Sequence, residues 1–127
     1  MEKTENALNW FEIAAADISR AKKFYDTVFD ADMALIDMNG MKMVVFPTDD
    51  STGKVSGALV ESEMHVPGAV GSLIYLNGNP DLAGPLGKVE AAGGQVVLGK
   101  TFISDEVGYM AFFVDTEGNK VGLHSHK

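Results

Sequence analysis

The feature that most constrains this sequence is an internal repeat, because the same order of predicted elements occurs twice in 127 residues. Apolar periodicity and turn residues predict strand, helix, strand, strand, strand over about residues 6–61, and again over about 70–127. Residues 62–69 lack such periodicity and are interpreted as a connector. One module alone would leave a face of its sheet uncovered. We therefore expect one α+β domain over 1–127, with two βαβββ modules forming an eight-stranded, cup-like sheet.

The first module carries clear boundary signals. Asp17 is a favourable helix N-cap, and the apolar residues after it recur with the 3.6-residue period of an amphipathic helix. Asn39-Gly40 between two apolar runs predicts a β-hairpin. Strands are expected at Leu8–Ile13, Met33–Met38, Met41–Phe46 and Val55–Val60, and the apolar helix face comprises Ile18, Ala21, Phe24, Tyr25, Val28 and Phe29.

The second module has a weaker helical signal. Asp81 is the expected cap, Pro85 lies early in the segment, and Gly93-Gly94 ends it. The apolar positions of this helix are Leu82, Leu86, Val89 and Ala92, and strands are expected at Ser72–Leu76, Gln95–Ile103, Tyr109–Asp115 and Lys120–His126.

Composition excludes several classes of function. The chain has no cysteine, 10 basic and 18 acidic residues, and a formal net charge of -8. Thiolate metal sites and cysteine nucleophiles are therefore excluded, and a phosphate backbone or an anionic membrane would be repelled. No apolar stretch is long enough for a membrane span, and the N-terminus has no signal-peptide pattern. We expect a soluble cytoplasmic protein without nucleic-acid or membrane partners.

Several short motifs, in order along nearly the whole chain, resemble the vicinal oxygen chelate superfamily of glyoxalases, bleomycin-resistance proteins and extradiol dioxygenases. Two departures are Asp30, where glycine is usual, and Thr116, where proline is usual; aspartate tolerates the left-handed conformation. The resemblance implies the fold of that superfamily and homodimer formation. The motifs are Trp10-Phe11-Glu12-Ile13, Asp17-Ile18, Phe24-Tyr25, Glu90-Ala91-Ala92-Gly93-Gly94 and Asp115-Thr116-Glu117-Gly118-Asn119.

The resemblance also implies where metal-dependent members hold their metal. Three of those positions fall on Trp10, Leu73 and Gly122. The fourth-strand position falls on Gly57 or Leu59, and Glu61 is the only carboxylate of the same strand parity. Indole, isobutyl and hydrogen cannot coordinate a divalent cation. We therefore expect no metal at the usual site and no other cofactor.

Strand alternation extends this set of positions into a candidate ligand site. If the implied positions face the cup, the residues two further along each strand face it too. Glu12 and His124 could then act as a general acid and base, clamp a ligand, or hydrogen-bond each other structurally. A displaced metal site with His126 and either Glu12 or Glu61 is a further alternative, and His65 is expected to be a solvated loop residue. The expected ligand-binding residues are Trp10, Glu12, Leu73, Tyr75, Gly122 and His124.

The leading hypothesis is a homodimeric protein that binds a small, partly apolar organic molecule in the cup without the usual metal. One alternative is a lyase, isomerase or dioxygenase-type enzyme that uses Glu12 and His124, with or without a displaced divalent metal. Another is an interaction subunit whose cup is filled by its own side chains. The sequence identifies neither the ligand nor whether the chain is catalytic.

Overall fold

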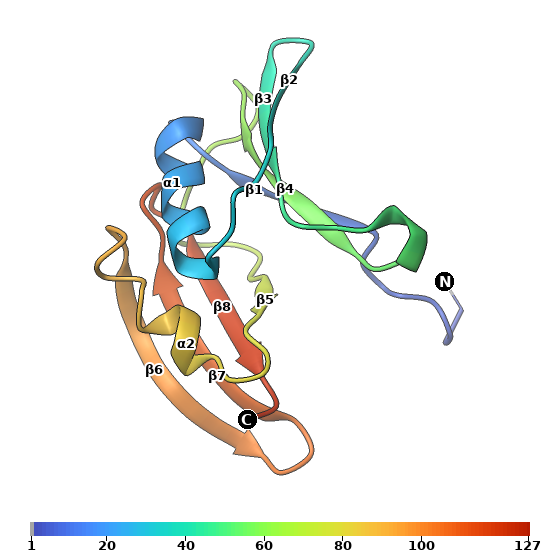
Figure 1. Cartoon of the computed structure of the whole chain (residues 1–127), viewed down its shortest axis with the longest axis vertical. Helices are drawn as coiled ribbons and strands as arrows, with labels where there is room; N and C mark the ends of the chain where they lie inside the picture. Colours follow the sequence, from blue (N-terminus) through green and yellow to red (C-terminus); the bar gives the residue numbers. More distant parts are fainter. Residues whose placement is uncertain (1) are drawn as a thin grey trace.

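The structure of the protein is a computed structural model, which describes residues 2–127 except the side chains of Met38 and Asp50. The described chain folds into eight strands and two α-helices (Figure 1). This arrangement confirms the predicted α+β fold of two modules. None of the helices in this part of the chain is long and apolar enough to cross a membrane. The elements are β1 (Trp10–Ala14), α1 (Ile18–Phe29), β2 (Leu35–Met38), β3 (Met41–Val45), the 3-10 helix η1 (Asp50–Thr52), β4 (Ser56–Glu61), β5 (Tyr75–Asn77), α2 (Ala83–Leu86), β6 (Gln95–Ser104), β7 (Gly108–Val114) and β8 (Lys120–Ser125).

The strands form two four-stranded sheets with the same topology. The order is β1-β4-β3-β2 in the first sheet and β5-β8-β7-β6 in the second. In each sheet the first strand pairs in parallel with the fourth, and the other pairs are antiparallel. The repeated element order in the sequence thus corresponds to a repeated topology, with β1 and β5 each at a sheet edge.

The boundary signals of the first module act as predicted. The Asp17 carboxylate accepts a hydrogen bond from the Arg20 N–H at 3.1 Å, and Asp30 ends α1 in the left-handed conformation at φ 52°. Asn39 and Gly40 have φ values of 52° and 81°. Two consecutive positive φ values define a type I′ turn, whose twist suits the β2–β3 hairpin.

The second module departs from the prediction in two places. Its helix spans only Ala83–Leu86 and gives way to turns, whereas the apolar pattern predicted a helix continuing to Ala92. Gly84, Pro85 and Gly87 are poor helix formers, which explains the early end. The strand predicted at Ser72–Leu76 is shifted to Tyr75–Asn77.

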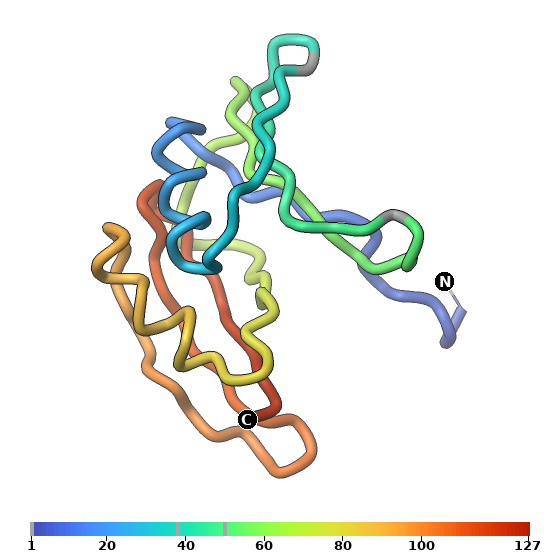
Figure 2. Tube along the Cα trace, in the orientation of Figure 1, coloured from blue at the N-terminus to red at the C-terminus, as the bar shows by residue number. Residues whose placement is uncertain are grey.

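One hydrophobic core lies between the two sheets and is shared by both modules. Phe24 of α1 packs against Phe113 of β7 with ring centroids 5.8 Å apart, and Tyr25 packs against Phe46 at 5.5 Å. The tube in Figure 2 shows α1 beside the C-terminal strands as well as beside its own sheet. Helix α1 therefore supplies core side chains to both modules.

The turn between β7 and β8 links the modules through hydrogen bonds. Glu117 accepts from the N–H groups of Ala16 and Asp17 at 2.9 and 2.8 Å, and its carboxylate pairs with Arg20 at 2.7 Å. Burial raises the pKa of Glu117, but hydrogen bonds from Arg20, the Asp17 N–H and Thr116 outweigh burial, so the pKa is lowered overall. This part of the family motif therefore caps the helix of the other module.

Two buried polar residues complete this link. The Tyr25 hydroxyl donates to Asp115 at 2.8 Å, and burial, followed by the Asp115 charge, raises the pKa of Tyr25 well above its usual value. The Asn119 side chain donates to the Ala14 carbonyl at 2.7 Å and accepts from the Gly68 N–H at 3.0 Å. Removing either residue would leave buried polar groups without partners, which is costly.

Candidate functional site

The predicted row of side chains on β1 is present. Phe11 and Ile13 pack against the core, while Trp10 and Glu12 lie on the opposite face of the sheet. The indole of Trp10 is 43% exposed, and its N–H donates to Glu12 Oε2 at 3.3 Å. Trp10 and Glu12 therefore share one face of β1, as strand alternation predicts.

The second row lies on β5, β7 and β8. Tyr75 pairs with Gly122, and Asn77 pairs with His124 in the parallel β5–β8 register. The Tyr75 ring covers Gly122 so closely that a Cβ built there would lie 2.6 Å from Tyr75 Cδ1. Phe112 of β7 flanks the same ring, with centroids 5.9 Å apart. An aromatic surface thus occupies a position at which the resemblance implies a metal ligand.

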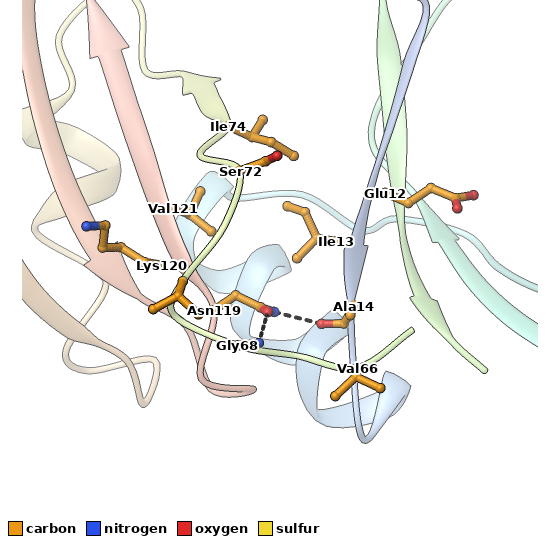
Figure 3. Close-up of a pocket in the computed structure, with 11 residues that line it drawn as sticks. Glu12, Ile13, Ala14, Val66, Gly68, Ser72, Ile74, Asn119, Lys120 and Val121 are labelled. Atoms are coloured by element: carbon orange, nitrogen blue, oxygen red, sulfur yellow. Dashed lines mark hydrogen bonds between the residues drawn. The ribbon is translucent and has the colours of Figure 1, made fainter. Parts of the chain in front are cut away.

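The two rows point away from each other within one chain, as follows from the orientation of the neighbouring side chains that Figure 3 labels. Ile13 of β1 and Val121 of β8 face one another across the core, whereas Glu12 and Lys120 point outward on opposite sides. Gly122 and His124 share the face of Lys120 because positions two apart on a strand have the same orientation. A single chain therefore does not bring Trp10 and Glu12 together with Tyr75 and His124.

Glu12 and His124 have different hydrogen-bond partners. Glu12 Oε1 lies 2.8 Å from Nε2 of His65, and Nδ1 of His65 lies 2.6 Å from the Ser62 hydroxyl. His124 Nε2 donates to the carbonyl of Val107 at 2.6 Å. The expectation that His65 is a solvated loop residue is wrong, because its side chain is largely covered and hydrogen-bonded at both ring nitrogens. No sequence motif marks this pair, which lies 53 residues apart.

The donor set does not fit a divalent metal at the position that the resemblance implies. Trp10 and Gly122 offer no metal-binding atom there, and Leu73 lies half-buried in the segment before β5. The assignment of the fourth-strand ligand position to Gly57 or Leu59 is wrong. In the register of β1 and β4, Trp10 pairs with Ser56 and Glu12 with Ala58. The residues of the opposite parity, Gly57, Leu59 and Glu61, therefore lie on the core-facing side of β4.

The side chains considered for a displaced metal site are dispersed within the chain. Glu61 accepts from the Ile18 N–H at 2.9 Å, at the start of α1, and Glu12 is bound to His65. The rings of His124 and His126 are close, with centroids 5.1 Å apart. Among residues 2–127, leaving aside the side chains of Met38 and Asp50, no three histidines, aspartates or glutamates form a metal-binding group.

A pocket of about 210 Å³ lies between β1 and the start of β5 and β8, beneath the connector (Figure 3). Asn119 bridges its floor through hydrogen bonds to Ala14 and Gly68. Val70, which follows the connector, lines this pocket and is 94% exposed, so its apolar side chain is uncovered. The lining residues are Glu12, Ile13, Ala14, Val66, Gly68, Val70, Ser72, Ile74, Asn119, Lys120 and Val121.

The fold matches those of several solved structures at low sequence identity. A hypothetical protein from S. aureus is 21% identical, with 98% of this chain and 99% of that chain covered and a TM-score of 0.62. A glyoxalase/bleomycin resistance protein/dioxygenase family enzyme from Burkholderia phytofirmans PsJN is 17% identical, with coverages of 94% and 98% and a TM-score of 0.65. TnmS3, an antibiotic binding protein from Streptomyces sp. CB03234, is 21% identical, with coverages of 98% and 98% and a TM-score of 0.64.

No protein-family model and no curated protein sequence matches the chain. The structural matches extend over almost the full length of this chain and of these three proteins. The chain therefore has the glyoxalase/bleomycin resistance/dioxygenase fold, in agreement with the motifs in its sequence. Fold alone does not determine function, which must be argued from the site.

Proposed function

We propose that this protein is a homodimer that binds a small, partly apolar organic molecule in a cup built from two copies. The first module of one copy contributes Trp10 and Glu12, and the second module of the other copy contributes Tyr75 and His124. The observation that carries this proposal is the outward, opposite orientation of the two rows within one chain. An aromatic residue, an aliphatic residue and a glycine occupy the ligand positions of the fold's metal-dependent members.

The exposed apolar surface supports a second copy as the missing half. Trp10 and Tyr75, which begin the edge strands β1 and β5, are 43% and 48% exposed. In the connector, Met64 is 91% exposed. Large apolar side chains are therefore exposed on two separate faces of the chain, and each face could be covered by a second copy. A twofold axis would place β1 of one copy beside β5 of the other, which forms two equivalent eight-stranded cups.

The chemistry of the combined cup suits a small organic ligand. Trp10, Tyr75 and Phe112 present aromatic faces for stacking, and Glu12 and His124 add a few polar groups that fix orientation. The antibiotic binding protein TnmS3 has the same fold at 21% identity, which supports ligand sequestration as the role of the cup.

A mixed-dimer experiment tests this arrangement with the neutral fluorescent probe Nile red. Trp10→Ala and Tyr75→Ala each remove an aromatic side chain from one half of every cup. Each variant alone should therefore bind the probe weakly. When the two variants are mixed and allowed to exchange subunits, one of the two cups in every mixed dimer is intact again. We therefore expect probe binding to return after exchange.

The control mixes Trp10→Ala with the double variant Trp10→Ala/Tyr75→Ala, which cannot assemble an intact cup in any combination. Return of binding in the first mixture alone supports the two-copy cup. If neither mixture regains binding although native mass spectrometry shows mixed dimers, the cup does not form between copies. A monomeric mass at micromolar concentration would also contradict the proposal.

Metal analysis tests the second part of the proposal. Protein purified without a tag should contain nickel, zinc, iron and manganese well below one equivalent per chain, because the implied ligand positions carry Trp10, Leu73 and Gly122. A chelator should leave Nile red binding and the thermal midpoint unchanged. Near-stoichiometric metal whose removal abolishes binding would overturn this part.

A further inference from the structure

A chain of hydrogen bonds on the outer face of β1 ends at the carboxylate of Glu12. Ser62 follows β4, and its hydroxyl oxygen accepts from the Met64 N–H at 3.1 Å. The same hydroxyl lies 2.6 Å from Nδ1 of His65, whose Nε2 lies 2.8 Å from Glu12 Oε1. Two segments that are distant in sequence therefore meet at one carboxylate.

One tautomer of His65, with its proton on Nε2, gives every group in this series of hydrogen bonds a partner. Ser62 then donates its hydroxyl proton to Nδ1, and the Nε2–H donates to Glu12. Both ring nitrogens of His65 are used, so His65 is a positioning residue and does not itself contact a ligand. Glu12 can still accept further hydrogen bonds, because its Oε2 receives only the indole N–H of Trp10 at 3.3 Å.

The carboxylate of Glu12 also lacks a permanent cation as its partner. Lys120, which lines the same pocket, holds its ammonium 5.4 Å from the centre of the Phe112 ring. Lys42 lies 3.8 Å from Glu61, which is on the other side of the first sheet. The Glu12 side chain is 35% exposed, and the formal net charge of the chain is -8. A cationic ligand would thus meet an accessible, negatively charged acceptor.

The indole of Trp10 adds a second attraction for a cation. Its N–H is directed at Glu12, which places carboxylate and indole side by side on one exposed face. Ammonium groups bind well over aromatic rings, best over tryptophan. The second module already shows this contact twice, with Lys100 lying 4.4 Å from the centre of the Tyr109 ring and Lys120 over Phe112. Within the described residues, Trp10 has no such internal cation.

We infer that Trp10 and Glu12 form a subsite for an organic ammonium group, with His65 and Ser62 holding the Glu12 carboxylate in place. The inference rests on the proposed function and deepens it, because it assigns a protonated or quaternary amine to the ligand of the cup. The apolar part of that ligand lies against the aromatic row of the second module. Anionic ligands of the same shape are disfavoured by Glu12.

The test uses the intrinsic fluorescence of Trp10, the single tryptophan of the chain. The probes are benzyltrimethylammonium, benzyl alcohol and benzoate, which share a ring and differ in charge. We expect a saturable fluorescence change with the cation, at least about tenfold weaker binding of the alcohol, and none of the benzoate, since tenfold corresponds to about 1.4 kcal/mol. Equal binding of cation and alcohol by the unaltered protein would overturn the inference.

Substitutions at Glu12 and His65 test whether these residues cause the preference for the cation. Glu12→Gln should weaken binding of the cation at least about tenfold and leave the alcohol unaffected, as expected for loss of an ion pair. Glu90→Gln, which changes an exposed glutamate in the turns after α2, is the matched control. His65→Ala should weaken binding of the cation, and His65→Gln should recover part of it because its amide N–H can donate to Glu12.

The outcomes separate this inference from the proposed function. If the mixed-dimer experiment restores Nile red binding but the cation has no advantage over benzyl alcohol, the cup stands and the ammonium subsite is wrong. If the cation binds but Glu12→Gln binds it equally well, the assignment to Glu12 is wrong. Far-ultraviolet circular dichroism and the thermal midpoint establish that each variant is folded before binding is measured.

Discussion

The two modules share a topology but differ in helix length and in the side chains on their outer sheet faces. The first module has a 12-residue helix, and its outer sheet face carries indole, carboxylate and imidazole groups. The second has a four-residue helix, a ten-residue β6 with register shifts, and an outer face dominated by Tyr75 and Phe112. The repeat therefore preserves strand order while the side chains diverge.

The difference in helix length has a physical explanation in the shared core. Phe24 and Tyr25 of α1 contact Phe113 of the second sheet as well as Phe46 near the first. Because α1 already covers part of the second sheet, the second module can tolerate Gly84 and Pro85 in its own helix. The modules are consequently interdependent, and neither is expected to be stable alone.

The largest test of this interdependence is Phe24→Ala. The side chain is 1% exposed and packs from α1 of the first module against Phe113 of the second, so its removal should lower the free energy of unfolding by about 3–5 kcal/mol. Leu86→Ala, at a half-buried position of α2, should cost less than about 2 kcal/mol. Urea unfolding followed by circular dichroism measures both. Equal costs would mean that the two helices contribute equally to the core.

Glu117→Gln tests the link between the second module and the start of α1. The carboxylate is 1% exposed and bonds two backbone N–H groups and Arg20, so the variant should lose about 1–2 kcal/mol near neutral pH. Because folding lowers the pKa of Glu117, the unfolded chain binds its proton more readily. The stabilisation is present above the unfolded pKa and is lost as pH falls through the folded pKa.

The measurement is urea unfolding of both proteins between neutral and acidic pH. The difference in unfolding free energy between the unaltered protein and Glu117→Gln should shrink as the carboxylate becomes protonated. Glu106→Gln, at an exposed position in the turn before β7, should follow the unaltered protein throughout. A difference that stays constant down to the most acidic condition would show that the charge of Glu117 is not its source.

The smallest expected effect compares the backbone conformation of one glycine in each module. Gly40 has φ 81°, so Gly40→Ala should cost about 1 kcal/mol through backbone strain although a Cβ would have free space. Gly99 in β6 also has free space but no positive φ, and Gly99→Ala should change stability by less than about 0.5 kcal/mol. Similar effects at both sites, measured by thermal unfolding, would contradict the assigned role of the hairpin turn.

Local signals in the sequence were sufficient for most of the fold. The Asp17 cap, the period of α1 and the Asn39-Gly40 turn depend on neighbours within a few residues, so they can be read without the tertiary structure. The outward face shared by Trp10 and Glu12 also follows from strand alternation. The second helix was predicted too long because its apolar spacing was given more weight than Gly84, Pro85 and Gly87.

Contacts between side chains that are distant in the sequence could not be predicted from such local signals. The sequence determined the repeated topology, the residue types at the positions where the resemblance implies metal ligands, and which side chains share a face of each strand. The tertiary structure decided that Glu12 meets His65 instead of His124, that Tyr75 covers Gly122, and that the two rows face away from each other. These outcomes depend on how the connector folds back and on which sheet faces pack against α1, and such long-range packing is set by burial across the whole core.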